Sequence, residues 1–268
     1  MRGAGLKPEE LVARHLDSLG TPAARAAVKS RVVQGTVRFK ILVGGGGWLE
    51  GQGAVVSEER KVDILRKFHT DYQGEQFISD GNKSYIAATR ADHRRTSFGE
   101  FVKSQSVMLQ EGLLGGALST GWTLLNLDHA NPKLSYGGLK KVDGRQLMVL
   151  HYESTKGNDM NIRLYFDPET YQHVMTVYEL TASAGLGALS NRPGAEPTQS
   201  SRQRDIRYTL EERFSNFITT DGITLPTHYN IHFIEELQSG QTGFYEWDMS
   251  VSDVQDNLTL DPRNFQVR

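Results

Sequence analysis

The sequence predicts a mainly β protein of the α+β class, with about ten to twelve antiparallel strands and an N-terminal helix. Three observations support this prediction. Residues 134–180 have the pattern of three consecutive antiparallel strands joined by tight turns at 143–145 and 167–170. Similar alternating stretches precede and follow them, and one helical stretch at 97–128 interrupts the strands. The chain therefore combines a large sheet with a helical insert.

The clearest strand of the predicted sheet ends just before the turn at 167–170. Its apolar side chains share one face and its polar side chains the other: Met160, Ile162, Leu164 and Phe166 alternate with Asn161, Arg163 and Tyr165. A period of two is typical of a strand with one covered face and one face in water. We therefore expect the apolar side chains to face a core or a ligand.

Composition excludes several classes of function. The 268 residues are 38% hydrophobic with a net charge of -2, so no basic excess is present to bind a nucleic acid. Cysteine is absent, which rules out disulfides and thiolate chemistry. No run of about 18 apolar residues is present, so no transmembrane segment is expected. No signal peptide is recognisable, which fits a cytosolic protein or a mature domain whose leader has been removed.

The first part of the chain is expected to form a helix and then a series of strands. Pro8 suits the first turn of a helix at 7–20, and Gly20 suits its end. Alternating stretches predict strands over 31–88. The four glycines at 44–47 permit a chain reversal between two of them.

The helical insert at 97–128 has apolar residues at helical spacing. They are Phe98, Phe101, Val102, Met108, Leu109, Leu113, Leu114 and Leu118, followed by Trp122. Gly112, Gly115 and Gly116 weaken this helix by roughly 1 kcal/mol each relative to Ala, so a helix, a bend and a second short helix are expected. The insert would either complete the core as a plug or cover an apolar cavity as a lid. The pattern alone favours the plug, because apolar helix stripes usually face a core.

Strands are expected again over 134–251, with one long interruption. Residues 182–204 are rich in Ala, Gly, Ser and Pro, which predicts a mobile loop at a hairpin tip. The alternative is a flap that contacts a ligand or a membrane. No domain boundary or repeat is evident, so residues 1–268 are expected to form a single domain.

The sequence contains no recognisable catalytic or metal-binding motif, and no cofactor is expected. The glycines at 44–47 are not followed by the Lys and Ser or Thr of a phosphate-binding loop. His228 and His232 share one strand face but lie about 13 Å apart, too far to share a metal ion. A cross-strand pair of carboxylates, such as Glu212 with Glu235, would support a hydrolase only in one register.

Four segments of the sequence carry a family resemblance. They are EELVARHLDSLG at 9–20, VQGTVRF at 33–39, YGGLKKVDGR at 136–145 running on to LYFDPET at 164–170, and 214–226, which ends in DGITLP. Together they resemble the LolA-like family of bacterial outer-membrane lipoprotein-sorting proteins. The resemblance covers roughly residues 7–252.

This resemblance implies an unclosed antiparallel barrel wrapped around a helical lid or plug. It also implies a non-enzymatic periplasmic protein that binds lipid or lipoprotein acyl chains in its apolar concavity. The lid and cavity candidates would be Phe98, Phe101, Val102, Met108, Leu109, Leu113, Leu114, Trp122, Met160, Ile162, Leu164 and Phe166. The alternative function is an envelope signalling or interaction module of the same fold, which binds a partner protein without transporting cargo.

Overall fold

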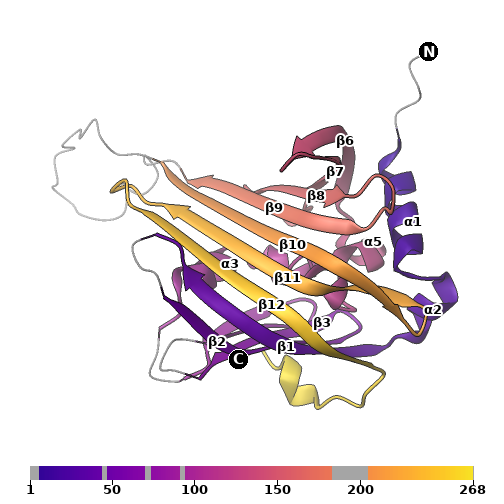
Figure 1. Ribbon diagram of the computed structural model, residues 1–268, viewed down its shortest axis with the longest axis horizontal. Coiled ribbons are helices and arrows are strands. Elements are labelled where there is room, and N and C mark those ends of the chain that lie inside the picture. Colours follow the sequence, from indigo (N-terminus) through magenta and orange to yellow (C-terminus); the bar gives the residue numbers. More distant parts are fainter. Residues whose placement is uncertain (1–5, 44–46, 70–73, 91–93, 183–204, 268) are drawn as a thin grey trace.

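One curved antiparallel sheet organises the molecule (Figure 1). The computed structural model describes residues 6–43, 47–69, 74–90, 94–182 and 205–267, and within them twelve strands form this sheet. The strands are β1 (Ser30–Ile41), β2 (Trp48–Glu58), β3 (Lys61–Phe68), β4 (Glu75–Ser79), β5 (Ser84–Ala88), β6 (Lys133–Val142), β7 (Arg145–Glu153), β8 (Asn161–Phe166), β9 (His173–Ala182), β10 (Ile206–Thr220), β11 (Ile223–Glu236) and β12 (Thr242–Asp256).

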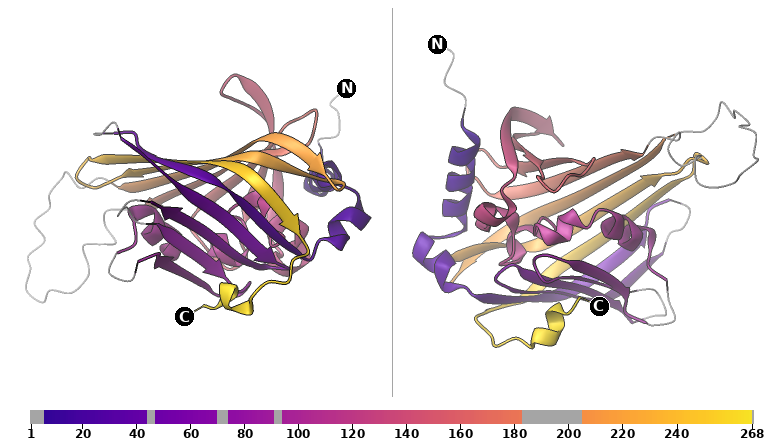
Figure 2. Two further views of the ribbon diagram at one scale, coloured as in Figure 1. Left: turned by 60° about the horizontal axis from the view of Figure 1, so that its bottom comes forward. Right: turned by 180° about the vertical axis from the view of Figure 1, so that it is seen from behind.

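The helices are short and lie at one end of the sheet or on one of its faces. They are α1 (Pro8–Leu19), α2 (Pro22–Ala27), α3 (Ser97–Ser104), α4 (Val107–Gln110) and α5 (Leu127–Ala130), with 3-10 turns η1 (Gly116–Leu118), η2 (Thr123–Leu125) and η3 (Pro262–Phe265). We call residues 97–130, from α3 to α5, the insert. Figure 2 shows the insert lying across the concave face of the sheet. No helix in the described part of the chain is long and apolar enough to cross a membrane.

The strand order explains why the insert crosses that face. The sheet runs β5-β4-β3-β2-β1-β12-β11-β10-β9-β8-β7-β6, so the first and last strands pair at its middle. The two edge strands, β5 and β6, are consecutive in the chain, and within the described residues they do not pair with each other. The segment that connects them must therefore pass from one edge to the other. The predicted unclosed antiparallel sheet with a helical insert is confirmed.

Alternating side chains build a core on the concave face. Met160, Ile162, Leu164 and Phe166 are all buried there, as the period-two pattern predicts. Their polar neighbours were expected to face water, and for Tyr165 this is wrong. Tyr165 packs in a second, smaller cluster with Val149 and Val177 on the convex face. The β6–β7 hairpin reaches over this face, where Asp143 pairs with Arg213 at 2.6 Å.

Residues 134–180 hold four strands, β6 to β9, where the sequence pattern predicted three. The two predicted turns are correct, but a third connection at 154–160 separates β7 from β8. It contains Gly157, whose φ of 72° marks a left-handed turn position. The alternating pattern of the strands on either side obscured this connection in the sequence.

Other elements follow the predictions closely. The N-terminal helix is where the sequence places it, and strands β1 to β5 lie within the predicted range of 31–88 apart from Ser30. The reversal at 44–47 falls mostly outside the described residues, although β1 and β2 pair as a hairpin from Lys40 and Trp48 onward. The predicted loop at 182–204 also lies outside them, apart from its first residue. The insert is divided into more pieces than a helix, a bend and a second helix.

The pairing of β1 with β12 depends on a glycine. The register shifts at Gly35, where an added Cβ would lie 2.1 Å from the carbonyl oxygen of Ser250. We therefore expect Gly35→Val to lower the free energy of unfolding by about 1–3 kcal/mol, because the strands must separate to admit the side chain. Urea denaturation measures this. Gly47→Ala, with nothing within 4 Å of its added Cβ, is the control and should change stability by less than about 0.5 kcal/mol. Equal stability of the two variants would contradict the packing argument.

Candidate lipid-binding site

The insert is the element that separates the concave face of the sheet from solvent. Its chain direction changes at Gly112, Gly115 and Gly116, which all have positive φ values, of 66°, 86° and 52°. L-residues adopt this conformation rarely, so glycines permit turns that end the helices. Gly116 also lies against the ring of Phe214, which an added Cβ would approach to 2.8 Å. These turns let consecutive short pieces follow the curvature of the sheet.

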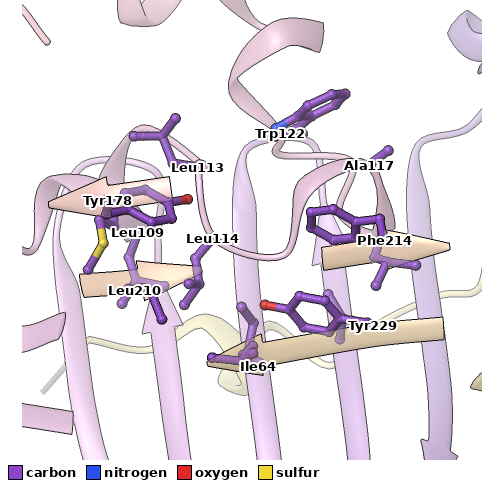
Figure 3. Close-up of a cluster of buried hydrophobic side chains, with 14 of the residues drawn as sticks. Ile64, Leu109, Leu113, Leu114, Ala117, Trp122, Tyr178, Leu210, Phe214 and Tyr229 are labelled. Atoms are coloured by element: carbon purple, nitrogen blue, oxygen red, sulfur yellow. The ribbon is translucent and has the colours of Figure 1, made fainter. Parts of the chain in front are cut away.

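The candidate lid and cavity residues all lie in one apolar core. Phe98, Phe101, Val102, Met108, Leu109, Leu113, Leu114 and Trp122 of the insert are at most 3% exposed, and Met160, Ile162, Leu164 and Phe166 of the sheet at most 7%. Figure 3 shows Leu109 and Leu114 beside Leu210, and Ala117 beside Phe214. These side chains fill the space between the insert and the sheet. An acyl chain could enter this space only if the insert moved.

Two of the candidates also reach a surface pocket. Met160 and Ile162 line a pocket of about 480 Å³ whose other lining residues are mostly polar, including Lys133, His151 and Glu153. The pocket lies by strands β6 to β8, and its lining residue Tyr152 also contacts Glu111 of the insert. Its mixed chemistry does not resemble the apolar cavity that the sequence predicts for an acyl chain.

Aromatic rings hold α3 against the sheet. The ring of Phe98 lies 5.4 Å from those of Phe77 and Phe233 and 5.0 Å from that of Trp247. The guanidinium group of Arg66 lies within 5.0 Å of the rings of Phe77, Phe98 and Trp247. A cation over an aromatic face is stabilised by the ring quadrupole, most strongly where water is excluded. Arg66 is 5% exposed, so α3 covers a buried cation.

A buried carboxylate caps α3. Glu75 on β4 accepts hydrogen bonds from the backbone N–H and the hydroxyl group of Thr96, each at 2.8 Å. The hydroxyl oxygen of Thr96 in turn accepts the N–H of Gly99 in the first turn of the helix. Burial raises the pKa of Glu75, although nearby Arg66 acts in the opposite direction. The start of the insert is thereby joined to an interior strand of the sheet.

A second buried carboxylate joins the middle of the insert to β10. Glu212 accepts hydrogen bonds from the backbone N–H of Gly115 at 2.8 Å, from the Tyr178 hydroxyl at 2.6 Å and from the Tyr229 hydroxyl. Glu212 is completely buried, and desolvation raises its pKa. The three donors compensate part of the cost of burying the group. Gly115 is therefore fixed in its left-handed turn by the sheet.

A third carboxylate belongs to the insert itself. Glu111, 4% exposed, accepts hydrogen bonds from the Tyr152 hydroxyl at 2.7 Å and from the Ser154 hydroxyl at 2.6 Å. Tyr152 also lies 3.0 Å from the hydroxyl of Thr123, farther along the insert. Burial and the Glu111 carboxylate raise the pKa of Tyr152. Glu111 and Glu212 thus connect the insert to both β7 and β10.

Two buried histidines lie where α1, the insert and the β8–β9 turn meet. The rings of His15 and His173 lie 4.9 and 5.0 Å from that of Trp122. His15 donates from Nδ1 to the carbonyl oxygen of Tyr171 at 2.8 Å, and Nε2 of His173 lies 2.8 Å from the hydroxyl of Thr176. Burial lowers the pKa of His15 to about 4 and that of His173 well below its usual value. Both imidazoles are neutral at pH 7.

Glu212 and Glu235, the cross-strand carboxylates that the sequence offered as a hydrolase pair, do not lie opposite each other. Glu212 is opposite Ile231 and Glu235 is opposite Tyr208, so the two carboxylates are four residues apart along the strands. His228 and His232 pair instead with Asp248 and Glu246, each at 2.9 Å. No group of three or more possible metal ligands occurs in the described part of the chain.

Sequence reasoning missed the polar contacts that hold the insert. One signal was present for Glu212, because it follows Tyr208 and Leu210 and precedes Phe214 in the period-two pattern of β10. A charged residue in phase with apolar ones faces the core and requires a buried partner. Its partner Gly115 is 97 residues away in the chain and could not be identified without the fold.

Comparison with known proteins identifies the fold. No family model and no curated protein matches the sequence. A LolA superfamily protein from Nitrosomonas europaea matches in structure with a TM-score of 0.51 and 13% identity, over 98% of this chain and 99% of its own. The chain has the LolA-like fold.

Two other solved structures have similar coverage. A DUF1329 family protein from Desulfovibrio piger matches with a TM-score of 0.49 and 13% identity, over 97% of both chains. A putative outer membrane lipoprotein-sorting protein domain from Vibrio parahaemolyticus matches with a TM-score of 0.49 and 12% identity, over 96% of this chain and 97% of its own. In the LolA-like fold of this chain, the insert occupies the concave face.

The role of Glu212 in holding the insert can be tested by substitution. Glu212→Leu leaves the Gly115 N–H and two tyrosine hydroxyls without an acceptor, so we expect a loss of about 3 kcal/mol or more. Amide hydrogen exchange at Gly115 should accelerate by more than the loss in the free energy of global unfolding predicts. Glu211→Leu is the matched control, because Glu211 pairs with Arg213 on the opposite face and should cost less than about 1 kcal/mol. Unchanged exchange at Gly115 in Glu212→Leu would show that Glu212 does not hold this part of the insert.

The buried histidines predict a loss of stability in acid. The pKa of His15 is about 4 when folded and near 6.5 when unfolded, so the unfolded chain binds more protons between these values. Stability is unaffected above about pH 6.5 and falls as the pH drops to 4, by about 3 kcal/mol for this group. The raised pKa values of Glu75 and Glu212 act in the opposite direction, because those groups stabilise the folded state more at low pH.

The contribution of His15 is therefore measured as a difference. His15→Asn retains a donor for the carbonyl oxygen of Tyr171 and removes the titration. Urea denaturation between pH 7 and pH 4 should show a shallower loss for this variant than for the wild type. His129→Asn, at an exposed position, should follow the wild type. Parallel pH profiles for wild type and His15→Asn would contradict the assigned pKa.

Proposed function

We propose that the protein is a non-enzymatic carrier that holds lipid or lipoprotein acyl chains between the insert and the sheet. The observation that supports this most directly is the construction of the insert. Most of the side chains that it buries are apolar, whereas a few polar contacts centred on Glu75, Glu111 and Glu212 hold it to the sheet. Polar contacts can be exchanged for water at little net cost, since a typical buried hydrogen bond contributes only about 1 kcal/mol.

Acyl-chain binding would replace one set of apolar contacts by another. An acyl chain of roughly 15 methylene groups gains about 12 kcal/mol on leaving water. The insert continues into the edge strands β5 and β6, so it can move away from the sheet without breaking any strand pairing. The chain would then pack against side chains of β7 and β8, such as Leu150 and Leu164, that the insert now covers.

A location in the bacterial periplasm is part of this proposal. It is supported by the LolA-like fold and by the resemblance of the four sequence segments to lipoprotein-sorting proteins. The expected absence of catalysis belongs to the same proposal, since a carrier needs affinity and release but no reacting groups.

Photolabelling tests where acyl chains bind. Palmitate with a diazirine in its chain should co-purify in native mass spectrometry and, after irradiation, label peptides of the insert and of β7–β8.

Because the chain has no cysteine, an introduced disulfide can lock the insert without competing thiols. An added Cβ on Gly121 would lie 3.3 Å from the Cα of Arg60, so Arg60→Cys with Gly121→Cys is within disulfide reach.

The locked protein supplies the control. The oxidised double variant should lose most labelling of the insert and of β7–β8, and the reduced form should regain it. Equal labelling in both forms, or no labelled peptide in these segments, would overturn the proposed site.

The β1–β2 hairpin favours a second function, that of an interaction module. Ile41, Leu42, Val43 and Trp48 are 40–55% exposed and lie together near its tip. A cluster of exposed apolar side chains commonly marks a contact with another protein.

If an envelope partner binds there, Leu42→Ser with Trp48→Ser should abolish its capture from periplasmic extract while palmitate labelling stays unchanged. Capture that persists in this variant would exclude the hairpin as the contact.

A further inference from the structure

Helix α2 lies between two pockets outside the concave core. It is six residues long, none of them buried, and it lies beside the β10–β11 turn at one end of the molecule (Figure 1). A pocket of about 500 Å³ lies on one side of it and a pocket of about 330 Å³ on the other. Val28, Ile223 and Leu225 line both pockets. The two pockets therefore adjoin along these side chains; we call them together the trough, and each pocket one of its openings.

The trough has apolar walls from four parts of the chain. Ile223 and Leu225 form its floor, at 7% and 6% exposure. The wall on the larger side is built by Leu16 and Leu19 of α1 and Leu125 of η2, and the opposite side by Ile218 and Val254, which are 53% and 36% exposed. Ile223 and Leu225 are thus apolar side chains that the two openings share.

Charge differs between the two openings. Arg25, Lys29 and Arg31 line the larger one with a single acid, Glu59, whereas Asp221 and Asp256 line the smaller one. Arg31 is engaged by Asp256 at 2.7 Å and donates to the carbonyl oxygen of Ala117. Arg25 lies 3.7 Å from the carboxylate of Asp17, so Lys29 supplies most of the positive charge at the larger opening. An anion is favoured there and disfavoured at the smaller opening.

We propose that this trough binds a long-chain fatty acid. The acyl chain lies in the larger opening, against Leu19, Ile223 and Leu225, and the carboxylate lies near Lys29 and Arg25. Pockets of this size are near the lower end of the range of about 300–1,000 Å³ for small-molecule sites, which suits one chain rather than a two-chain lipid. Two cations, one of them already donating to the carbonyl oxygens of Leu16 and Gly20, suit a singly charged head group. This site is distinct from the proposed site between the insert and the sheet.

Helix α2 provides matched variants for the test. Ala26 lines only the larger pocket, Ala27 only the smaller one, and Ala23 neither, and all three are exposed. A tryptophan at each position is therefore compatible with the fold. Ala26→Trp and Ala27→Trp fill the two openings, while Ala23→Trp adds the same side chain outside the trough.

The probe is cis-parinaric acid, whose fluorescence reports an apolar site. Binding is measured on the oxidised Arg60→Cys, Gly121→Cys protein, in which the insert is held closed. Ala26→Trp should raise the Kd at least about tenfold, equivalent to 1.4 kcal/mol, and Ala27→Trp should raise it less, whereas Ala23→Trp should change it by less than about twofold. Lys29→Gln should weaken binding of the acid about threefold or more and leave binding of its methyl ester unchanged.

Each outcome decides the assignment. If Ala26→Trp and Ala23→Trp bind alike, the trough is not the site. If the acid and its methyl ester bind alike and Lys29→Gln affects neither, the head group is not recognised as proposed. Loss of probe binding on oxidation of the cysteine pair itself would assign the probe to the insert site, and would leave the carrier proposal standing while the trough proposal fails.

Discussion

The fold depends on covering one apolar surface, the concave face of a sheet whose two edges are consecutive in the chain. Because β5 and β6 follow one another in sequence, the connection between them can span the face or leave it exposed to water. The arrangement in which the connection spans the face is favoured, because burying apolar surface gains about 25 cal/mol of free energy per Å² removed from water. The period-two alternation of every long strand then follows, since side chains on one face must meet the insert and those on the other must meet solvent or the β6–β7 hairpin.

The buried carboxylates limit how the insert covers that surface. Apolar packing alone is tolerant of small shifts, because many arrangements bury similar areas. Glu75, Glu111 and Glu212 each accept hydrogen bonds from donors at defined positions, so a shifted insert would leave buried groups without partners at about 1–3 kcal/mol each. Packing supplies most of the stabilisation, and the carboxylates select one register. Such an interface has one defined closed arrangement.

The sequence was sufficient to predict the strands, but it did not predict the breaks in the insert or the contacts between distant segments. Alternation in β8 predicted its core face correctly, and the stripe of the insert predicted its burial. The helical breaks were underestimated because a glycine reveals only that positive φ is permitted, and the surroundings decide whether it is used. Tyr165 was misplaced because a hairpin that folds back over a sheet leaves no local pattern. Contacts such as Glu212 with Gly115 depend on a register that one sequence does not contain.

The insert forms a wall of both proposed sites, and this links them energetically. Ala117 and Leu125 line the trough from η1 and η2, while Leu109, Leu113 and Leu114 of the same insert fill the concave core. A movement that admits an acyl chain between insert and sheet removes one wall of the trough. If both proposals hold, a fatty acid in the trough would bind the closed arrangement better than the open one and, by linkage, would stabilise the closed arrangement. The coupling between the two sites would therefore be negative. A fatty acid in the trough would oppose entry of an acyl chain between the insert and the sheet, and that acyl chain would lower the affinity of the trough for the fatty acid.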